Sequence, residues 1–122
     1  MNKKIIKFKL PEGGEKEFTF WYGTGFLGNA IEKLEMTIDE IINHLNKNPF
    51  KVLPILLHES YSYGFWREGK ECDYRLVDMI DLIDENGISE ASVTSWINGL
   101  TESLTKDTPK VKKGNDDKPK KK

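Results

Sequence analysis

Apolar and charged side chains alternate along the first part of the chain. Residues 4–10 read KIIKFKL, in which every second position from Ile6 onward is apolar and the positions between them are lysines. A period of two is typical of a half-buried β-strand. A proline and two glycines follow over 11–14, and the alternation resumes over 17–22. We therefore predict an antiparallel β-hairpin, which must pack against the remainder of the chain because an isolated hairpin is only marginally stable in water.

A helical period replaces the alternation from Phe26 onward. Apolar side chains recur every three or four residues as far as Met36, as expected for a helix that buries one face. Thr37 and Glu40 have the spacing of a capping box, in which each side chain bonds the free backbone N–H of the other residue. The pattern predicts a first helix that ends near Met36 and a short second helix that begins after Thr37.

Three further helices are expected in the second half of the chain. Pro54 lacks a backbone N–H and fits only in a first turn, so the third helix should begin near Leu53. Its end lies within 61–72, where the aromatic residues alternate as in a strand, whereas the residues before them suit a helix. A helical period returns over 73–85, and a last helix is predicted over 90–104.

Together with the composition, these elements predict an α+β fold that is mainly α. The chain has 122 residues, of which 37% are hydrophobic, enough for one small domain but not for two. We expect a short N-terminal β-hairpin followed by a compact bundle of about four to five helices, in a single domain over 1–105. The single cysteine, Cys72, cannot form an internal disulfide, which favours a reducing compartment, and no stretch reads as a signal peptide or a membrane span.

Charge is divided unevenly between this domain and the end of the chain. Residues 1–105 carry 11 basic and 17 acidic side chains, a net charge of −6, whereas 106–122 carry 8 and 3, a net charge of +5. Because 106–122 contain a single aliphatic residue, Val111, they cannot bury enough apolar surface to offset their ordering entropy. We predict a disordered, lysine-rich tail. Such a tail can bind phosphates, but the acidic domain would repel them, so nucleic acid is not the favoured partner.

The expected hairpin is followed by Gly23, Gly25 and Gly28, in the literal order G-x-G-x-x-G. In a dinucleotide-binding fold such glycines let the backbone approach a pyrophosphate, and a second parallel strand carries an acidic residue about 20 positions later. Here a second helix is predicted where that strand should be. We interpret the glycines as a flexible joint between the hairpin and the first helix, with nucleotide binding as the less favoured alternative.

Residues able to bind a metal or catalyse a reaction are scattered along the chain. No H-E-x-x-H or C-x-x-C spacing connects the candidates, which are His44, His58, Glu59, Cys72 and Asp73. His58 lies in a strongly apolar helix and is expected to be a hydrogen-bonded interior residue, and no serine or cysteine has the sequence context of a nucleophile. We therefore expect no metal, no cofactor and no enzymatic activity.

The fourth predicted helix carries a row of carboxylates. They alternate with an apolar stripe and are Asp78, Asp81, Asp84 and Glu85. Such a row can serve acid–base chemistry or magnesium binding, but a solvated helix face accounts for it more simply. We adopt the solvated face as the interpretation.

Four large aromatic rings occur within six residues. They are Tyr61, Tyr63, Phe65 and Trp66, and Arg67 follows directly. Rings of this kind either fill a core or anchor a partner, because aromatic and arginine side chains are enriched at protein interfaces. The sequence favours the two roles equally.

The order of the segments is more informative than any single motif. The stretch FLGNAIEKLE at 26–35 leads to TIDEI at 37–41, then to Asn48-Pro49, an apolar helix and two amphipathic helices. Over about residues 17–104 this arrangement resembles the tail assembly chaperones of long-tailed bacteriophages. The chain departs from the family pattern at Met36 and Thr37, where many members have a glycine after the leucine–glutamate pair.

The resemblance implies a small helical protein that binds the long tape-measure protein and keeps it soluble while the tail tube assembles in the host cytoplasm. It implies the tape-measure protein as partner, the tail-tube protein as a second candidate, and self-association or several copies on one partner. The expected partner-binding residues are Phe26, Leu27, Tyr61, Tyr63, Phe65 and Trp66. The alternative is a small regulatory or nucleic-acid-associated protein that acts through its basic C-terminal tail.

Overall fold

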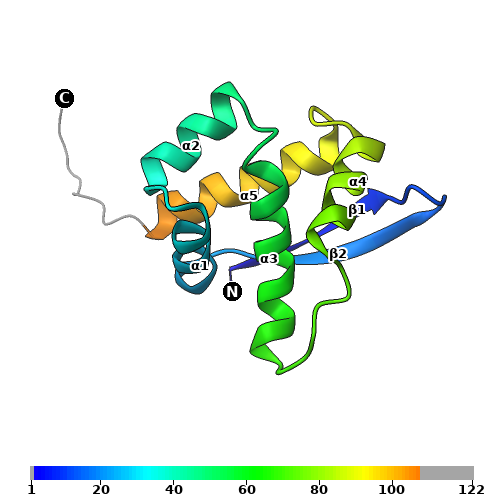
Figure 1. Ribbon diagram of the computed structural model, residues 1–122, viewed down its shortest axis with the longest axis horizontal. Helices are drawn as coiled ribbons and strands as arrows, with labels where there is room; N and C mark the ends of the chain where they lie inside the picture. The colour runs from blue at the N-terminus through cyan, green and yellow to red at the C-terminus, as the bar shows by residue number, and fades with distance from the viewer. Residues whose placement is uncertain (1, 108–122) are drawn as a thin grey trace.

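A computed structural model describes residues 2–107, which form an N-terminal β-hairpin and five helices (Figure 1). In chain order the elements are β1 (Lys3–Lys9), β2 (Glu15–Trp21), α1 (Thr24–Leu34), α2 (Ile38–Lys47), α3 (Leu53–Arg67), α4 (Leu76–Asn86) and α5 (Ala91–Asp107). This order confirms the predicted α+β, mainly α fold. The predicted tail over 106–122 lies outside the described residues, except that α5 continues to Asp107.

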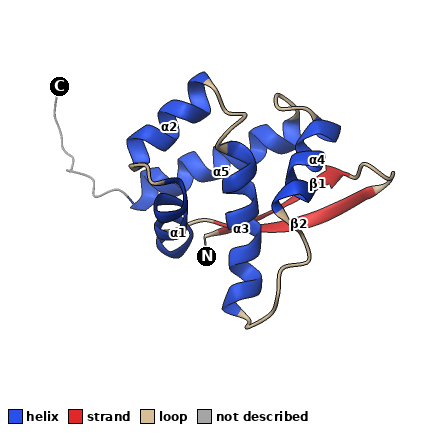
Figure 2. Ribbon diagram, viewed as in Figure 1, coloured by secondary structure: helices blue, strands red, loops and turns tan. Residues whose placement is uncertain are grey.

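The helices cover one face of the hairpin (Figure 2). β1 and β2 pair in antiparallel register, with Ile6 opposite Phe18. Both of these side chains are buried beneath the helices, as are Phe8 and Phe20, whereas Ile5 on the opposite face is 61% exposed. The alternation of the sequence therefore reports correctly which side of each strand faces the core.

The end of β1 is closed by a side chain from α4. The Lys9 N–H donates to Asn86 Oδ1 at 3.0 Å, and Asn86 Nδ2 donates to the Lys9 carbonyl oxygen at 2.9 Å. The same Nδ2 also donates to the Leu82 carbonyl oxygen at 2.8 Å within α4. The amide thus makes the pair of backbone contacts that a neighbouring strand would make.

The core is built around one tryptophan. α3 packs across β2, while α4 and α5 pack against β1, and Trp96 of α5 is fully buried among them. Its Nε1 donates to Ser60 Oγ at 3.2 Å, and the Ser60 hydroxyl donates to the Trp21 carbonyl oxygen at 2.7 Å. The buried hydroxyl therefore both donates and accepts a hydrogen bond, which offsets the cost of removing it from water.

Two predicted helix starts are confirmed. The Glu40 N–H donates to Thr37 Oγ1 at 3.1 Å and the Thr37 N–H donates to Glu40 Oε1 at 2.8 Å, so the capping box of α2 is complete. α3 begins at Leu53 with Pro54 in its first turn, where the missing N–H of proline costs no helical hydrogen bond. Both starts are set by local chemistry that can be read directly in the sequence.

The end of α3 settles the ambiguous aromatic segment. The helix continues to Arg67, so Tyr61, Tyr63 and Phe65 are helical and not part of a strand. The strand-like alternation arises because α3 is contacted on more than one side: the Tyr61 ring lies 5.2 Å from that of Phe18 in the core, and Tyr63 packs elsewhere.

α4 begins three residues later than the periodicity predicted. The helix starts at Leu76 and not at Asp73. The Arg75 N–H donates to Asp78 Oδ2 at 2.9 Å, which satisfies a backbone donor at the helix start. Asp73 instead accepts a hydrogen bond from the Tyr61 hydroxyl at 2.8 Å, which holds it outside the helix.

Candidate functional site

Two of the six expected partner-binding residues lie in the core. Phe26 has no exposed surface and its ring lies 6.4 Å from that of Trp96, while Tyr61 is only 6% exposed. Burial raises the pKa of Tyr61, as does its hydrogen bond to Asp73. The expectation that Phe26 and Tyr61 present an apolar surface to a partner is corrected, because the hairpin and helices bury both rings.

Two more of these residues are half-buried supports of the core. Leu27 packs against the core from α1. The Phe65 ring lies 5.1 Å from that of Tyr61 in an edge-on arrangement. Replacing Phe65 with a polar residue would therefore disturb folding as well as any surface, so its side chain cannot serve as a clean test of partner binding.

The remaining two, Tyr63 and Trp66, belong to a partly exposed cluster that we call the aromatic edge, together with Trp21, Arg67 and Lys3. The Tyr63 ring lies 6.1 Å from Trp21 and 5.6 Å from Trp66, which is 69% exposed. The Arg67 guanidinium lies 4.9 Å from the Trp21 ring centre, and Lys3 Nζ lies 5.1 Å from it. Both cations are within the range of a cation–π contact.

The G-x-G-x-x-G glycines are explained largely by packing around this edge. A Cβ on Gly25 would collide with the Tyr63 hydroxyl. A Cβ on Gly23, whose φ is 99°, would lie 2.9 Å from Asn2 Nδ2, whereas nothing lies within 4 Å of a Cβ on Gly28. Close approach of side chains, together with the positive φ of Gly23, accounts for the first two glycines.

A second surface, formed by α4 and the turn before α3, carries exposed large hydrophobic side chains. The sequence analysis did not identify it. Phe50 is 70% exposed, Val77 46%, Ile80 39% and Leu76 37%, and these are four of the seven exposed large hydrophobic residues within 2–107. Three of them, Phe50, Leu76 and Ile80, line a groove of about 300 Å³, which we call the α3–α4 groove. It is lined by Phe50, Lys51, Leu53, Pro54, Ile55, Leu76, Ile80, Ile83, Asp84 and Ile88.

The helix α4, which forms one wall of the α3–α4 groove, is acidic. α4 carries four carboxylates and no basic residue. Asp78 is paired with Arg75, whose Nε lies 3.3 Å from Asp78 Oδ2, and this contact lowers the pKa of Asp78. Asp84 lines the groove from α4, and Lys51 lines it from the turn before α3.

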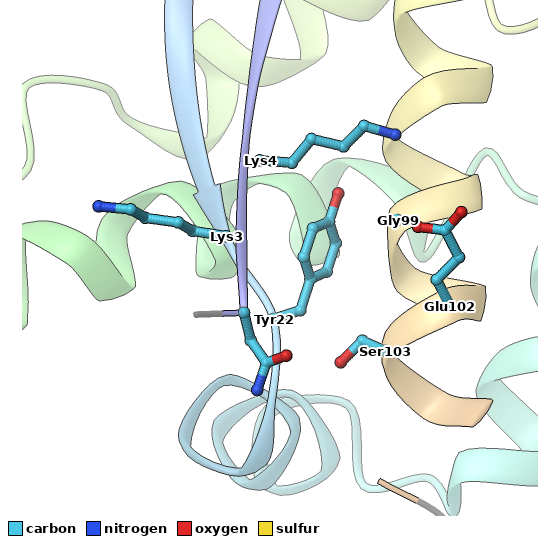
Figure 3. Close-up of a pocket in the computed structure, with 7 residues that line it drawn as sticks. Lys3, Lys4, Tyr22, Gly99, Glu102 and Ser103 are labelled. Carbon is cyan, nitrogen blue, oxygen red and sulfur yellow. The ribbon is translucent and has the colours of Figure 1, made fainter. Parts of the chain in front are cut away.

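A smaller hollow of about 270 Å³ lies between β1 and α5 (Figure 3). Lys4 Nζ donates to the Ser95 carbonyl oxygen at 3.1 Å, and the Tyr22 hydroxyl donates to the Trp96 carbonyl oxygen at 3.0 Å. Burial raises the pKa of Tyr22, and the charge of Glu102 raises it further. The phenol therefore stays protonated and bound to the backbone, so it is not a candidate base.

Gly99 of α5 allows Tyr22 to reach this position. A Cβ on Gly99 would lie 2.5 Å from the Tyr22 hydroxyl and 2.7 Å from the ring carbon that bears it. We expect Gly99→Ala to lower the free energy of unfolding by about 1 kcal/mol or more, because overpacking outweighs the gain in helix propensity.

The matched control for Gly99 is Gly28→Ala in α1. A Cβ there meets nothing within 4 Å, so the substitution should raise the free energy of unfolding by about 0.5–1 kcal/mol. Urea denaturation of both variants measures the difference. If both substitutions changed the free energy of unfolding equally, the Tyr22 side chain would move away from residue 99 without cost, and the prediction would be wrong.

The other candidate ligands are dispersed. His58 Nε2 lies 2.8 Å from the Tyr74 carbonyl oxygen, which can only accept, so His58 is a hydrogen-bonded, half-buried residue. Burial raises the pKa of the Cys72 thiol, which is a free cysteine. No group of three or more His, Cys, Asp or Glu residues within 2–107 is arranged to hold a metal ion.

The length and hydropathy of the helices show whether any of them could span a membrane. Within the described residues, no helix combines the length and apolar character that crossing a bilayer requires.

Comparison of the chain with protein-family models, with curated proteins and with solved structures gave no match. The aromatic edge and the α3–α4 groove are therefore the features from which a function can be inferred.

Proposed function

We propose that the protein is a tail assembly chaperone of a long-tailed bacteriophage, which binds the tape-measure protein in the host cytoplasm and keeps it soluble during tail-tube assembly. Two things support the proposal: the resemblance of residues 17–104 to that family, and the apolar α3–α4 groove. On this proposal the protein acts by binding and has no catalytic activity.

The gathering of apolar side chains at the α3–α4 groove is the observation that carries the proposal. Burying a side chain of the size of Phe50 or Ile80 stabilises a complex by about 1.5–3 kcal/mol relative to leaving it in water. Within one small domain, isolated exposed hydrophobic residues are ordinary, but a contiguous set around a groove is typical of a binding surface. A holdase needs such a surface to cover apolar segments of its client.

The aromatic edge offers a second contact to the same client. Trp66 is 69% exposed, and Arg67 lies over the Trp21 ring of the same edge. Tryptophan and arginine are enriched among residues that dominate binding energies. Several copies of the protein along one extended client would gain avidity from having more than one contact each.

The test replaces two exposed side chains that line the α3–α4 groove, one from the turn before α3 and one from α4. We expect Phe50→Ser with Ile80→Ser to reduce co-purification with the co-expressed tape-measure protein at least about tenfold, because two anchors are lost. The control is Ile5→Ser, which removes a side chain that is 61% exposed on the uncovered face of the hairpin.

The outcome is interpretable because thermal unfolding reports folding separately. Undiminished co-purification by a double variant that still unfolds cooperatively would reject the groove as the client site. Loss on Trp66→Ser alone would move the site to the aromatic edge. If the wild-type protein never co-purifies with the tape-measure protein, the proposed function itself is wrong.

A further inference from the structure

We propose that the segment held in the α3–α4 groove is an amphipathic helix whose apolar face is flanked by lysine or arginine side chains. This inference rests on the proposed function, since it names the chemistry of the partner at the same groove. Three observations carry it: the helical walls of the groove, the charge of α4, and the composition of the other segments that could occupy the groove.

The walls of the groove favour a helical partner. One wall comes from the first turn of α3, including Leu53 and Ile55, and the other from α4, including Leu76 and Ile80. A helix satisfies its own backbone hydrogen bonds and offers side chains spaced at i, i+3, i+4 and i+7 to an apolar groove. An extended strand would need backbone partners, which a sheet edge provides and helical walls do not.

The charge of α4 favours basic flanks on that helix. Asp84 and Glu85 lie in the last turn of α4, where the helix has no basic residue and where its own dipole already places partial negative charge. Asp81 and Glu85 are one turn apart, an arrangement in which like charges repel. Among the residues whose side chains the structure describes, neither Asp84 nor Glu85 has a salt bridge. Asp84 lines the groove, so a cation from a partner can pair with its carboxylate there.

The asymmetry of the groove orients the bound helix. Asp84 stands on the α4 side, and Lys51 stands on the side of the turn before α3. The basic flank of the partner should therefore lie along α4. An acidic flank on this side would be repelled by Asp84, so the same charge that attracts a basic partner disfavours an acidic one.

Two other occupants fit less well. The chain's own segment 108–122 is rich in lysine but has one aliphatic side chain, Val111, which cannot fill a groove of about 300 Å³. A second copy paired symmetrically through the same groove would bring the two α4 helices together, and each carries four carboxylates. Both occupants nevertheless give distinct outcomes in the experiment.

The experiment measures binding of designed peptides to the full-length protein by fluorescence anisotropy. The probes are a labelled leucine–lysine peptide of about 18 residues, or five turns, with helical periodicity, and a leucine–glutamate peptide of the same pattern. We expect the lysine peptide to bind at least about tenfold more tightly, with affinity that falls as salt rises. Asp84→Lys with Glu85→Lys should reverse the preference.

The matched control is Glu32→Lys with Glu71→Lys, which changes the net charge equally at exposed positions outside α4. This control should keep the preference for the lysine peptide. Equal binding of both peptides, or a preference that the Asp84 and Glu85 reversals leave unchanged, would overturn the inference. Equally tight binding of a lysine–serine peptide would also overturn it, because purely electrostatic capture is what a tail such as 108–122 would show.

Sedimentation and co-purification separate this inference from the proposed function. A concentration-dependent dimer that Phe50→Ser abolishes would identify a second copy as the occupant and overturn the inference. Tape-measure binding that survives the Asp84 and Glu85 reversals but not Phe50→Ser with Ile80→Ser would refute the basic flank and leave the proposed function standing. Selective binding of the lysine peptide by a protein that does not bind the tape-measure protein would refute the proposed function and leave the basic flank of the partner standing.

Discussion

Replacing Trp96 by alanine is expected to lower the free energy of unfolding by about 3–5 kcal/mol. The side chain has no exposed surface, and its ring lies 5.8 Å from that of Tyr22 and 6.4 Å from that of Phe26. Its removal leaves a cavity between α5 and the hairpin and deprives Ser60 Oγ of the hydrogen bond from Nε1. Urea denaturation followed by far-ultraviolet circular dichroism measures the loss.

The control for this variant is Trp66→Ala on the aromatic edge. Trp66 is 69% exposed, so we expect its removal to change the free energy of unfolding by no more than about 0.5 kcal/mol. A stability loss of the same size in both variants would contradict the described core. The pair also separates folding from the proposed function, because Trp66→Ala should leave a folded protein in which the proposed binding can be assayed.

A similar loss, about 3–5 kcal/mol, is expected from Phe18→Ala. Four aromatic rings surround Phe18: their centres lie 5.6 Å away for Phe8, 6.0 Å for Phe20, 5.2 Å for Tyr61 and 5.1 Å for Tyr74. Edge-on and offset contacts of this kind add to the transfer energy of the ring. The substitution therefore weakens the attachment of the hairpin to α3 at its centre.

The matched substitution is Ile5→Ala on the opposite face of the hairpin. Its side chain is 61% exposed, and we expect a change of no more than about 0.5 kcal/mol. Hydrogen exchange gives an independent readout, since Phe18→Ala should accelerate exchange of the β1 and β2 amides. Equal stability of the two variants would contradict the assignment of the inner and outer faces of the hairpin.

Much of the fold follows from short-range signals in the sequence. The period of two around Phe18 and Phe20 defines the buried face of β2, and the Thr37 and Glu40 pair defines the start of α2. Pro54 limits where α3 can begin. Each of these signals acts within a few residues, so no knowledge of distant contacts is needed.

The end of α3 could not be predicted from the local sequence, because it is determined by contacts with distant residues. Tyr61 faces Phe18 of the hairpin, whereas Tyr63 reaches Trp21 and the first turn of α1. A helix that is contacted on several sides has no single apolar stripe, which explains why its residues read partly as a strand. Packing with sequence-distant elements overrode the local pattern.

The candidate surface was the least predictable feature. The expected set included Phe26 and Tyr61, which the fold buries, and omitted Phe50, which is 70% exposed. Hydrophobic character alone does not distinguish a side chain that reaches the core from one that stops short of it. Ile80 illustrates this, since it shares the apolar stripe of α4 with buried Met79 and Ile83 but is 39% exposed.

The hydrogen bonds between Asn86 and the backbone of Lys9 affect how readily the hairpin can pair with the sheet of another molecule. Within 2–107 the sheet has two strands, so each has a free edge open to strand addition by another molecule. Asn86 occupies the end of one edge, and four of the seven residues of β1 are lysines, which repel one another between chains. Both features disfavour edge-to-edge pairing between the sheets of neighbouring molecules.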